Sequence, residues 1–401
     1  MSRGGAFTSD VAVVGGCGHV GLPLAIAFAD RGLSVRIYDI DEDAVAAVNR
    51  GQLPFHEDGA AEPLRRALAH GRLTASAEAA SVEGAENVVV VIGTPVDEHL
   101  NPDPVAVRHA IMDCAPYLSD GQLLVLRSTV YPGVTASVEA MVRELGRDMD
   151  VAFCPERIAQ GAALRELVEL PQIVGARTER AAERAEALFR VLTDSVLRVS
   201  PEEAELAKLF TNTWRYIKFA IANQFFMMAN DYGLDYERIR AVIRENYPRA
   251  ADLPGAGFAA GPCLLKDTMQ LAAFTNNSFV LGHSAMLVNE GLPLYLISRL
   301  ERRFDLATMS LGILGMAFKP GTDDTRDSLS YKLRRIARFR AREVLCTDER
   351  VTTDPTLLPL EEVLERADVL VIATPHPEYR DFETSKPVVD IWNLRGGGTV
   401  V

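Results

Sequence analysis

The sequence predicts an α/β fold with two Rossmann-like, doubly wound parallel-sheet domains, joined by a long central helix and a helical middle domain. Two observations support this prediction. Short apolar runs typical of strands alternate with helical patterns towards both ends of the chain, and an unusually long helical pattern fills the middle. We therefore expect three domains, at residues 1–200, 201–304 and 305–401.

The composition is that of a globular protein and argues against several function classes. The chain has 401 residues, of which 48% are hydrophobic and 24% charged. A formal net charge of -13 disfavours a nucleic acid partner, which would need a basic face. No apolar stretch has the length of a membrane span, and no signal sequence is visible. Five cysteines without paired spacing argue against a zinc site, so we expect no metal and a cytoplasmic location.

The first predicted strand, at residues 11–14, leads into a glycine-rich turn. Gly16, Gly18 and Gly21 fit the pattern GxGxxG, and a helical pattern follows. Such glycines allow a tight turn, the approach of a pyrophosphate to the backbone, and close packing of helix on strand. Asp39 ends the second predicted strand, where a carboxylate binds the ribose hydroxyls of NAD. The segment therefore predicts dinucleotide binding, with NAD favoured over NADP.

Polar residues follow several of the next apolar runs, which lie at residues 87–92, 122–126, 151–153 and 172–174. The residues after the first three runs are Gly93, Thr94 and Pro95, then Ser128 and Thr129, then Pro155, Glu156 and Arg157. Because ligands bind at the carboxyl edge of a parallel sheet, we expect these residues to share a cleft. Turn chemistry is the alternative for the two threonines. A carboxylate at the end of a buried strand is costly unless it has a partner or a function, so Glu156 is a candidate functional residue.

A capping box opens the long central helix. Ser200 and Glu203 have the required spacing, and the helical pattern then continues for roughly thirty residues. Lys208 and Asn212 lie four residues apart and share one face, which we expect to point into a cleft; a solvated polar face is the alternative. The apolar stripe suits a spine between domains or an oligomer interface, and consists of Leu206, Phe210, Ile217, Ile221 and Phe225.

Cys263 follows a turn rich in glycine and alanine at residues 255–262. Lys266 and Asp267 come shortly after it, so a cation and a carboxylate lie near the thiol in sequence. A neighbouring positive charge favours the thiolate, which is the reactive form of cysteine. A small buried hydrophobe is the alternative for a lone cysteine.

The alternation of strands and helices restarts after the middle of the chain. Helical patterns lie at residues 236–245 and 266–300, predicted strands at 309–314, 343–346, 369–373 and 388–391, and an arginine-rich helix at 324–339. Lys319 and Arg326 follow the first of these strands, in a position suited to an anionic ligand. Surface charge is the alternative for both.

Together these motifs resemble the UDP-glucose/GDP-mannose dehydrogenase family, whose members use NAD to oxidise the 6-hydroxyl of a nucleotide sugar to a carboxylate. The resemblance extends over nearly the whole chain and rests on residues 14–23, 93–95, 128–133, 155–157, 204–213, 263–267 and 315–326, in the family's order. It implies two hydride transfers to NAD per sugar, with a thiohemiacetal and a thioester formed on a cysteine. The three expected domains would then bind NAD, carry the cysteine loop, and bind the nucleotide sugar.

The resemblance also implies a role for each matching residue. The catalytic residues would be Cys263 as nucleophile, Lys208 as the cation at the alkoxide, Asn212 and Asp267 for substrate and water, Glu156 for thioester hydrolysis, and Thr129 beside the reacting carbon. The NAD contacts would be Gly16, Gly18, His19, Val20, Gly21, Asp39, Thr94, Pro95, Ser128 and Thr129. The substrate contacts would be Glu156, Arg157, Lys208, Asn212, Arg249, Gly257, Phe318, Lys319 and Arg326, with Arg249 reaching the substrate of a neighbouring subunit.

The sequence departs from the family pattern just before the cysteine. The family usually has two glycines and then Ser or His, whereas Ala, Ala, Gly and Pro occupy residues 259–262 before Cys263. The segment around Glu156 resembles the branch that acts on UDP-N-acetylhexosamines, while Lys266 and Asp267 resemble the UDP-glucose branch. Both sugar classes therefore stay open.

Two other functions fit part of the pattern. A two-electron β-hydroxyacid dehydrogenase shares the first domain and the helical spine but does not need Cys263. A non-catalytic nucleotide-sugar-binding homologue would keep the fold with the altered loop. For the leading interpretation we expect a UDP-sugar as small-molecule substrate, no nucleic acid or membrane partner, and a homodimer or larger homo-oligomer because of the long helix.

Overall fold

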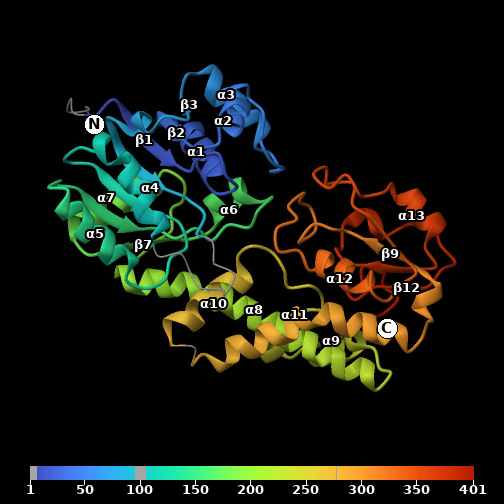
Figure 1. Cartoon of the computed structure of the whole chain (residues 1–401). Coiled ribbons are helices and arrows are strands. Elements are labelled where there is room, and N and C mark those ends of the chain that lie inside the picture. The colour runs from blue at the N-terminus through green and yellow to red at the C-terminus, as the bar shows by residue number, and fades with distance from the viewer. Residues whose placement is uncertain (1–6, 95–104, 277) are drawn as a thin grey trace. The chain divides into compact units, whose positions relative to one another are not determined.

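The computed structural model describes residues 7–94, 105–276 and 278–401. The chain forms two compact units, Met1–Phe210 and Thr211–Val401, and each contains a sheet with helices on its faces. In Figure 1 the sheet of the first unit runs from blue to green, and the sheet of the second unit is orange to red. The predicted α/β class with two Rossmann-like sheets is confirmed.

The first unit is built on an eight-stranded sheet with strand order β3-β2-β1-β4-β5-β6-β7-β8. Its strands are β1 Ser9–Val14, β2 Val35–Tyr38, β3 Leu73–Ser76, β4 Ala85–Val90, β5 Leu123–Leu126, β6 Asp150–Phe153, β7 Gln172–Ala176 and β8 Val196–Val199. Its helices are α1 Gly21–Asp30, α2 Glu42–Asn49, α3 Ala61–Ala69, α4 Ala106–Cys114, α5 Val134–Glu144, α6 Ala163–Glu169 and α7 Glu179–Phe189, with short 3-10 helices at Ala79–Val82 and Ala115–Tyr117. The predicted strands up to residue 174 are all present within a few residues of their expected positions.

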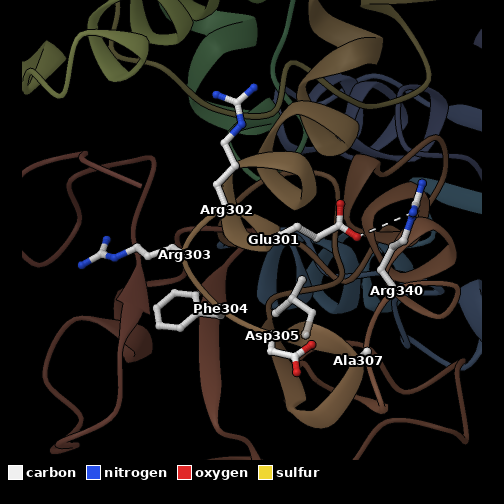
Figure 2. Close-up of a pocket in the computed structure, with 8 residues that line it drawn as sticks. Glu301, Arg302, Arg303, Phe304, Asp305, Ala307 and Arg340 are labelled. Carbon is white, nitrogen blue, oxygen red and sulfur yellow. Dashed lines mark ion pairs between the residues drawn. The ribbon is translucent and has the colours of Figure 1, made fainter.

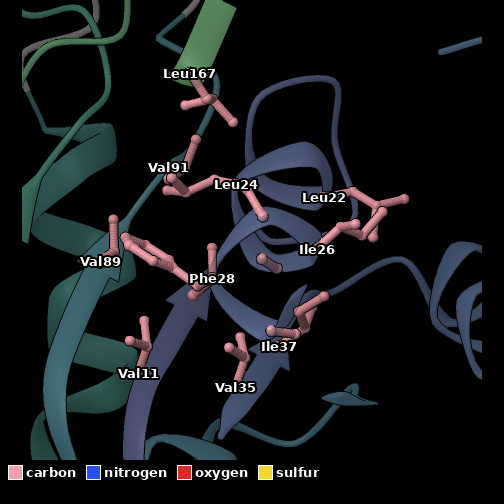
Figure 3. Packing of buried hydrophobic residues seen from close by; sticks show 14 of the residues in the cluster. Val11, Leu22, Leu24, Ile26, Phe28, Val35, Ile37, Val89, Val91 and Leu167 are labelled. Carbon is pink, nitrogen blue, oxygen red and sulfur yellow. The ribbon is translucent and has the colours of Figure 1, made fainter. Parts of the chain in front are cut away.

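Strand β1 lies inside this sheet, between β2 and β4, and its residues alternate between two cores. Val11 and Val13 face the cluster that contains Phe28 of α1, whereas Ala12 and Val14 face the opposite cluster. Figure 3 shows Phe28 among the side chains of β1, β2 and β4. Because both faces are covered, residues 11–14 of the strand are all apolar, as a buried parallel strand requires.

The last two strands of the sheet differ from the all-parallel prediction. Strand β7 pairs antiparallel with β6, and β8 pairs parallel with β7. The link from β6 to β7 carries only the seven-residue helix α6, which packs against α1. A parallel arrangement of β6 and β7 would need a crossover connection with a helix on the face of the sheet. Because the connection contains only the short α6, β7 instead pairs with β6 in the antiparallel direction.

Helix α8, Pro201–Asp231, has 31 residues and is the longest helix of the chain among the described residues. The predicted capping box is confirmed: Ser200 Oγ accepts a hydrogen bond from the Glu203 amide at 3.3 Å, and the Ser200 amide donates to Glu203 Oε2 at 2.8 Å. At a rise of about 1.5 Å per residue the helix is about 46 Å long.

The second unit contains a four-stranded, all-parallel sheet with strand order β10-β9-β11-β12. Its strands are β9 Ser310–Leu314, β10 Glu343–Thr347, β11 Val369–Ile372 and β12 Val388–Val389. Its helices are α9 Tyr236–Arg244, α10 Leu264–Phe274, α11 Val280–Glu301, α12 Leu329–Ala337 and α13 Leu360–Arg366, with 3-10 helices at Pro248–Ala250, Leu306–Thr308 and Pro377–Tyr379.

The helix predicted at residues 324–339 begins later than expected, at Leu329. Asp327 adopts a left-handed conformation with φ 51°, which a continuing helix cannot contain. Ser328 then caps the helix by accepting a hydrogen bond from the Ser330 amide at 3.3 Å. Residues 324–327 therefore form a loop at the carboxyl end of β9, and this loop carries Arg326.

Within residues 7–94, 105–276 and 278–401, no helix combines the length and apolar character needed to cross a lipid bilayer.

Glu205 connects the start of α8 to the start of α5. Its carboxylate is buried and accepts hydrogen bonds from the Gly133 amide at 2.8 Å, the Thr135 amide at 2.8 Å and Thr135 Oγ1 at 2.5 Å. The two amides belong to the first turn of α5, where backbone donors have no partner within the helix. Glu205 therefore caps α5 from outside, and this fixes the segment that follows Ser128 and Thr129.

We predict that Glu205→Ala lowers the free energy of unfolding by at least about 3 kcal/mol, because several buried donors lose their acceptor at once. Urea unfolding followed by circular dichroism measures the change. Glu183→Ala, at an exposed position of α7, is the matched control and should stay within about 0.5 kcal/mol of the wild type. An equal effect of the two variants would contradict the capping role.

Candidate active site

In the glycine-rich turn after β1, neighbouring atoms leave no room for a side chain at Gly16 or Gly21, but they do at Gly18. A Cβ added at Gly16 would lie 2.8 Å from Ile37 Cγ2, and one at Gly21 would lie 2.6 Å from the Gly15 carbonyl oxygen. The left-handed turn itself falls on Gly15, with φ 75°, one residue before the predicted position. An added Cβ at Gly18 would meet its nearest atom only at 3.9 Å. The open space beside Gly18 suits the approach of a pyrophosphate, so the turn fits a dinucleotide.

Asp39 lies directly after β2 and faces this turn. Its Oδ2 accepts a hydrogen bond from the Cys17 amide at 2.8 Å, and its Oδ1 accepts one from the Asp41 amide at 3.1 Å. Burial raises the pKa of Cys17 to about 12, so this thiol stays protonated and inert. His19, at the tip of the turn, lies with Nδ1 2.9 Å from Gln160 Nε2. The carboxylate thus lies beside the turn, and its contact with a ribose stays a prediction.

The polar residues at the ends of β4 and β5 come together as the sequence predicts. Ser128 Oγ accepts a hydrogen bond from the Ile92 amide at 2.8 Å, and Thr94 Oγ1 donates to the Thr129 carbonyl at 2.7 Å. The two strand ends therefore form one edge of the sheet. Pro95, the other predicted contact in this segment, lies outside the described residues.

A buried ion pair joins the ends of β5 and β6. The Arg127 guanidinium donates to Glu156 Oε2 through Nε at 2.8 Å and through a second, shorter contact. It also donates to the Cys154 carbonyl and to Gln172 Oε1, both at 3.0 Å, and it lies over the Phe189 ring at 4.8 Å. Arg127 is 2% exposed. Such a pair is retained only where each charge has several partners, as it has here.

The second oxygen of Glu156 is also engaged. Glu156 Oε1 accepts hydrogen bonds from the amides of Arg157 at 2.7 Å and Ile158 at 2.9 Å. The Arg157 guanidinium donates to the Pro171 carbonyl, and burial lowers the pKa of Arg157. The adjoining cavity has a volume of about 10 Å³, roughly the size of one water molecule. In this arrangement the Glu156 carboxylate holds the loop after β6, and its part in hydrolysis stays a prediction.

Three of the predicted catalytic groups follow one another along α8 and α10. Lys208 and Asn212 are both buried and lie one helical turn apart on α8. Asn212 Nδ2 donates to Asp267 Oδ2 at 2.5 Å, and Lys266 Nζ lies 3.2 Å from Asp267 Oδ1. Among the described residues, no group donates a hydrogen bond to Asp267 Oδ1, although it is buried. That oxygen therefore has Lys266 Nζ as its neighbour and keeps the capacity to accept a hydrogen bond.

The cysteine loop is held at Gly257 by two buried asparagines. Asn223 accepts a hydrogen bond from the Gly257 amide at 2.9 Å and donates to the Gly257 carbonyl at 3.0 Å, and its amide also donates to Asn289 Oδ1 at 2.9 Å. The Trp392 ring lies against the Cα of Gly257, where an added Cβ would be only 2.1 Å from the ring. Only glycine fits beneath this tryptophan.

The same loop is held a second time at Gly261. A Cβ on Gly261 would lie 2.5 Å from the Phe318 ring, and the Gly261 amide donates to the Asp327 carbonyl at 3.3 Å. Gly261 has φ 98°, a conformation that favours glycine. Cys263 is exposed and stands at the N-cap of α10. The Ala, Ala, Gly, Pro segment therefore forms an ordered turn that presents the thiol.

The loop after β9 is fixed by a buried aspartate and histidine. Asp348 Oδ2 accepts hydrogen bonds from the amides of Met316 at 2.7 Å and Ala317 at 2.9 Å, and lies 3.1 Å from His376 Nε2. His376 Nδ1 in turn accepts from the Gly321 amide at 3.3 Å. Burial opposes the charge, but His376 and the two amides hold the pKa of Asp348 below its usual range. The loop that carries Phe318 and Lys319 is thus fixed at both ends.

Arg249, another predicted contact, and a surface pocket near the end of α11 lie apart from these loops. Arg249 is exposed, with its guanidinium 5.8 Å from the centre of the Tyr247 ring. A pocket of about 470 Å³ at the end of α11 is lined by Glu301, Arg302, Arg303, Phe304, Asp305, Leu306, Ala307 and Arg340. Figure 2 shows Arg302 and Arg303 pointing in different directions, while Glu301 pairs with Arg340. The pocket contains none of the predicted site residues.

Several supporting residues were not identified from the sequence, and these are Arg127, Asn223, Asn289, Asp324, Asp348, His376 and Trp392. Most lie on segments remote in sequence from the groups they hold, so spacing carried no signal. Arg127 is the exception. A charged residue at the end of an apolar strand, opposite Glu156 on the next strand, is a signal that could have identified the pair.

Comparisons with known proteins agree with this geometry. Three models of the UDP-glucose/GDP-mannose dehydrogenase family match the chain: the NAD binding domain at residues 9–193, the central domain at 202–290 and the UDP binding domain at 312–395. The UDP-N-acetyl-D-mannosamine dehydrogenase of Pyrococcus horikoshii is 33% identical over 378 residues, which cover 91% of this chain and 89% of the relative. The NDP-N-acetyl-D-galactosaminuronic acid dehydrogenase of Ralstonia solanacearum is 30% identical, covering 95% of this chain and 96% of the relative. The solved structure of a UDP-glucose dehydrogenase from Pyrobaculum islandicum is 28% identical with a TM-score of 0.88, over 97% of this chain and 95% of that chain.

We predict that Arg127→Met lowers the free energy of unfolding by about 3–5 kcal/mol, because the buried Glu156 carboxylate loses its cation. Urea unfolding measures the change. The double variant Arg127→Met/Glu156→Gln is the matched control: it should recover at least about half of the loss, since a neutral amide needs no counter-charge. A double variant no more stable than the single one would contradict the ion-pair account.

Proposed function

The chain belongs to the UDP-glucose/GDP-mannose dehydrogenase family, and we propose that it oxidises the C6 hydroxyl of a UDP-hexose to a carboxylate through a thioester on Cys263. The chain is an NAD-dependent nucleotide-sugar dehydrogenase. The observation that carries the proposal is the setting of Cys263, the exposed one of the five cysteines, in a turn fixed at Gly257 and Gly261.

The residues of the first unit fit NAD. The open space at Gly18 admits a pyrophosphate, and Asp39 stands where the ribose would lie. Bound NAD would accept the hydride in each of the two oxidation steps. We propose Thr94, Ser128 and Thr129 as further contacts, because they form one edge of the sheet together.

The chemistry requires a nucleophile between the two oxidations. Loss of a hydride from C6 and of the hydroxyl proton gives an aldehyde, whose remaining C6 hydrogen leaves as hydride only after a nucleophile has added to the carbonyl. Addition of the Cys263 thiol across the carbonyl forms a C–S bond and a thiohemiacetal. Loss of a second hydride and a proton then gives a thioester. Water attacks the thioester, the C–S bond breaks, and the acid and the thiol are released.

We assign the polar residues of α8 and α10 to the oxygen atoms of this sequence. Lys208, as an ammonium group on a buried helix face, stabilises the oxyanion in each step. Asn212 fixes Asp267 through its 2.5 Å hydrogen bond, and the second carboxylate oxygen is free of hydrogen bonds among the described residues. That oxygen is suited to position the attacking water. Lys319 and Arg326 are proposed to bind the diphosphate, from the loop after β9.

Among the possible sugars we favour a UDP-N-acetylhexosamine over UDP-glucose. Relatives of 33% and 30% identity are named as dehydrogenases of UDP-N-acetyl-D-mannosamine and of an N-acetyl-D-galactosamine derivative. The fixed loop after β6, where Glu156 pairs with Arg127, is the segment whose sequence resembles that branch. We retain the division into NAD-binding, central helical and UDP-sugar-binding domains, and a cytoplasmic location, as part of the proposal.

We also propose that the protein is a homodimer that associates through α8. Trp214, Ile221, Phe225, Met228 and Tyr232 are exposed by 41–81% and recur at intervals of three, four or seven residues. This spacing places them on one face of the helix, as in a coiled-coil seam. An exposed apolar face of this length is typical of an interface, and a second copy of the same helix would complement it.

To test the reaction, purified protein is incubated with NAD and, separately, UDP-N-acetylmannosamine, UDP-N-acetylglucosamine, UDP-glucose, UDP-galactose and GDP-mannose. We predict two NADH per sugar oxidised, highest activity with an N-acetylated UDP-sugar, and a loss of at least about a thousandfold in acid formation for Cys263→Ala. Cys346→Ala, which removes a buried thiol from β10, is the control and should keep the stoichiometry. One NADH per substrate from an active Cys263→Ala variant would instead indicate a two-electron dehydrogenase, and binding without NADH formation would indicate a non-catalytic homologue.

We predict that the double variant Ile221→Glu/Phe225→Glu shifts the protein from dimer to monomer in sedimentation-velocity experiments, because buried carboxylates would face each other across the interface. Phe339→Glu is the matched control, since Phe339 is 84% exposed at the end of α12. The control should sediment like the wild type. A wild-type monomer, or a variant that remains a dimer, would place the interface elsewhere or exclude it.

A further inference from the structure

Arg326 is held in one orientation by Asp324. Its Nε lies 3.0 Å from both carboxylate oxygens, and its Nη2 donates to Asp324 Oδ2 at 2.6 Å. The Arg326 amide donates to the same carboxylate at 2.9 Å. Asp324 is buried, whereas the Arg326 side chain is 56% exposed. A bidentate pair of this kind fixes the plane of the guanidinium and leaves its outer edge open.

The loop that carries Arg326 is bonded to the loop that carries Cys263. The Gly261 amide donates to the carbonyl of Asp327, the residue next to Arg326. The Phe318 ring packs on Gly261, and the Phe318 amide donates to the Asp324 carbonyl at 2.9 Å. The two loops are therefore hydrogen-bonded to each other although they are remote in sequence. Arg326 lies on one of them and Cys263 on the other.

The charges on these two loops act on each other. The pKa of Arg326 is raised by its hydrogen bond and ion pair with Asp324, and also by the negative charges of Cys263 and Asp327. Electrostatic coupling is reciprocal, so a cation whose charged form is favoured by a thiolate favours that thiolate equally. Two further charged residues, Lys266 and Asp267 on α10, follow Cys263 closely in sequence, and their Nζ and Oδ1 atoms lie 3.2 Å apart as an ion pair.

We propose that Arg326, positioned by Asp324, is the cation that stabilises the thiolate of Cys263. Ionisation of the thiol releases its proton to solvent while Arg326 stays protonated throughout. The same charge assists at two points of the reaction, since the thiolate is both the group that adds to the aldehyde and the group that leaves the thioester. This role is distinct from the diphosphate contact proposed above. Its role in catalysis rests on the proposed function, whereas the effect of the Arg326 charge on the Cys263 thiol is a property of the protein without ligands.

The test measures the thiol in the absence of NAD and sugar. Iodoacetamide is added to the full-length protein between pH 5 and pH 10, and modification of Cys263 is followed by peptide mass spectrometry. The other four cysteines are buried, so the signal is specific. We expect Arg326→Gln to raise the pH midpoint of the reaction by about one unit and Arg326→Lys to restore most of it, because an opposite charge favours the thiolate. Asp324→Asn should also shift the midpoint, since it releases the guanidinium.

Arg335→Gln is the matched control, because it removes the same charge from an exposed site on α12 of the same unit. It should leave the midpoint unchanged. Equal midpoints in the wild type, Arg326→Gln and Asp324→Asn would overturn the proposal, and so would an Arg326→Lys variant shifted as far as Arg326→Gln. If Arg326→Gln does not fold, the Lys and Asp324→Asn variants decide. Failure of the thioester mechanism would appear separately, as an NADH stoichiometry of one with an unchanged shift in alkylation.

Discussion

The contact of two aromatic rings with two glycines determines the geometry of the thiol. Trp392 lies on Gly257 and Phe318 lies on Gly261, and in neither place is there room for a Cβ. Both rings come from loops at the carboxyl end of the second sheet, so the turn before Cys263 takes its shape from that sheet rather than from its own sequence. A ligand that moves the loop of Phe318 would therefore also move the turn before Cys263, because the Phe318 ring is packed tightly against Gly261.

Helix α8 shows how one element supplies polar groups in two directions. Glu205 points towards α5 and caps it, whereas Asn212, two turns later, bonds Asp267 of α10. Lys208 lies between them in the sequence of the helix and is also buried. Each of these groups would be costly to bury alone. In each unit, the part of the long helix that belongs to it therefore carries buried polar groups as well as apolar ones.

The sequence predicted those parts of the molecule whose determinants are local. The glycine turn before Gly21 and the capping box at Ser200 each contain all their determinants within a few residues, and both are confirmed. The direction of β7 was not predictable, because it depends on how the short α6 packs against α1. The partners of Glu156 and Arg326 depend on the register of β5 beside β6 and on the loop at Asp327. The ion pair between Lys266 and Asp267 joins sequence neighbours, and the influence of Lys266 on the Cys263 thiol stays a prediction.

The two sheets place an aspartate at the same position and use it differently. Asp39 and Asp348 each follow the second strand of their sheet and accept backbone amides from the loop after the first strand. Beside Asp39 the loop has open space at Gly18, whereas beside Asp348 the loop residues are buried Met316 and Ala317, and His376 covers the carboxylate. The helix that should receive a pyrophosphate at its N-terminus also begins late in the second unit, at Leu329. The loop after the first strand of the second sheet therefore lacks the space and the helix end that a dinucleotide needs, and the binding of an anion by Lys319 and Arg326 on this loop stays a proposal.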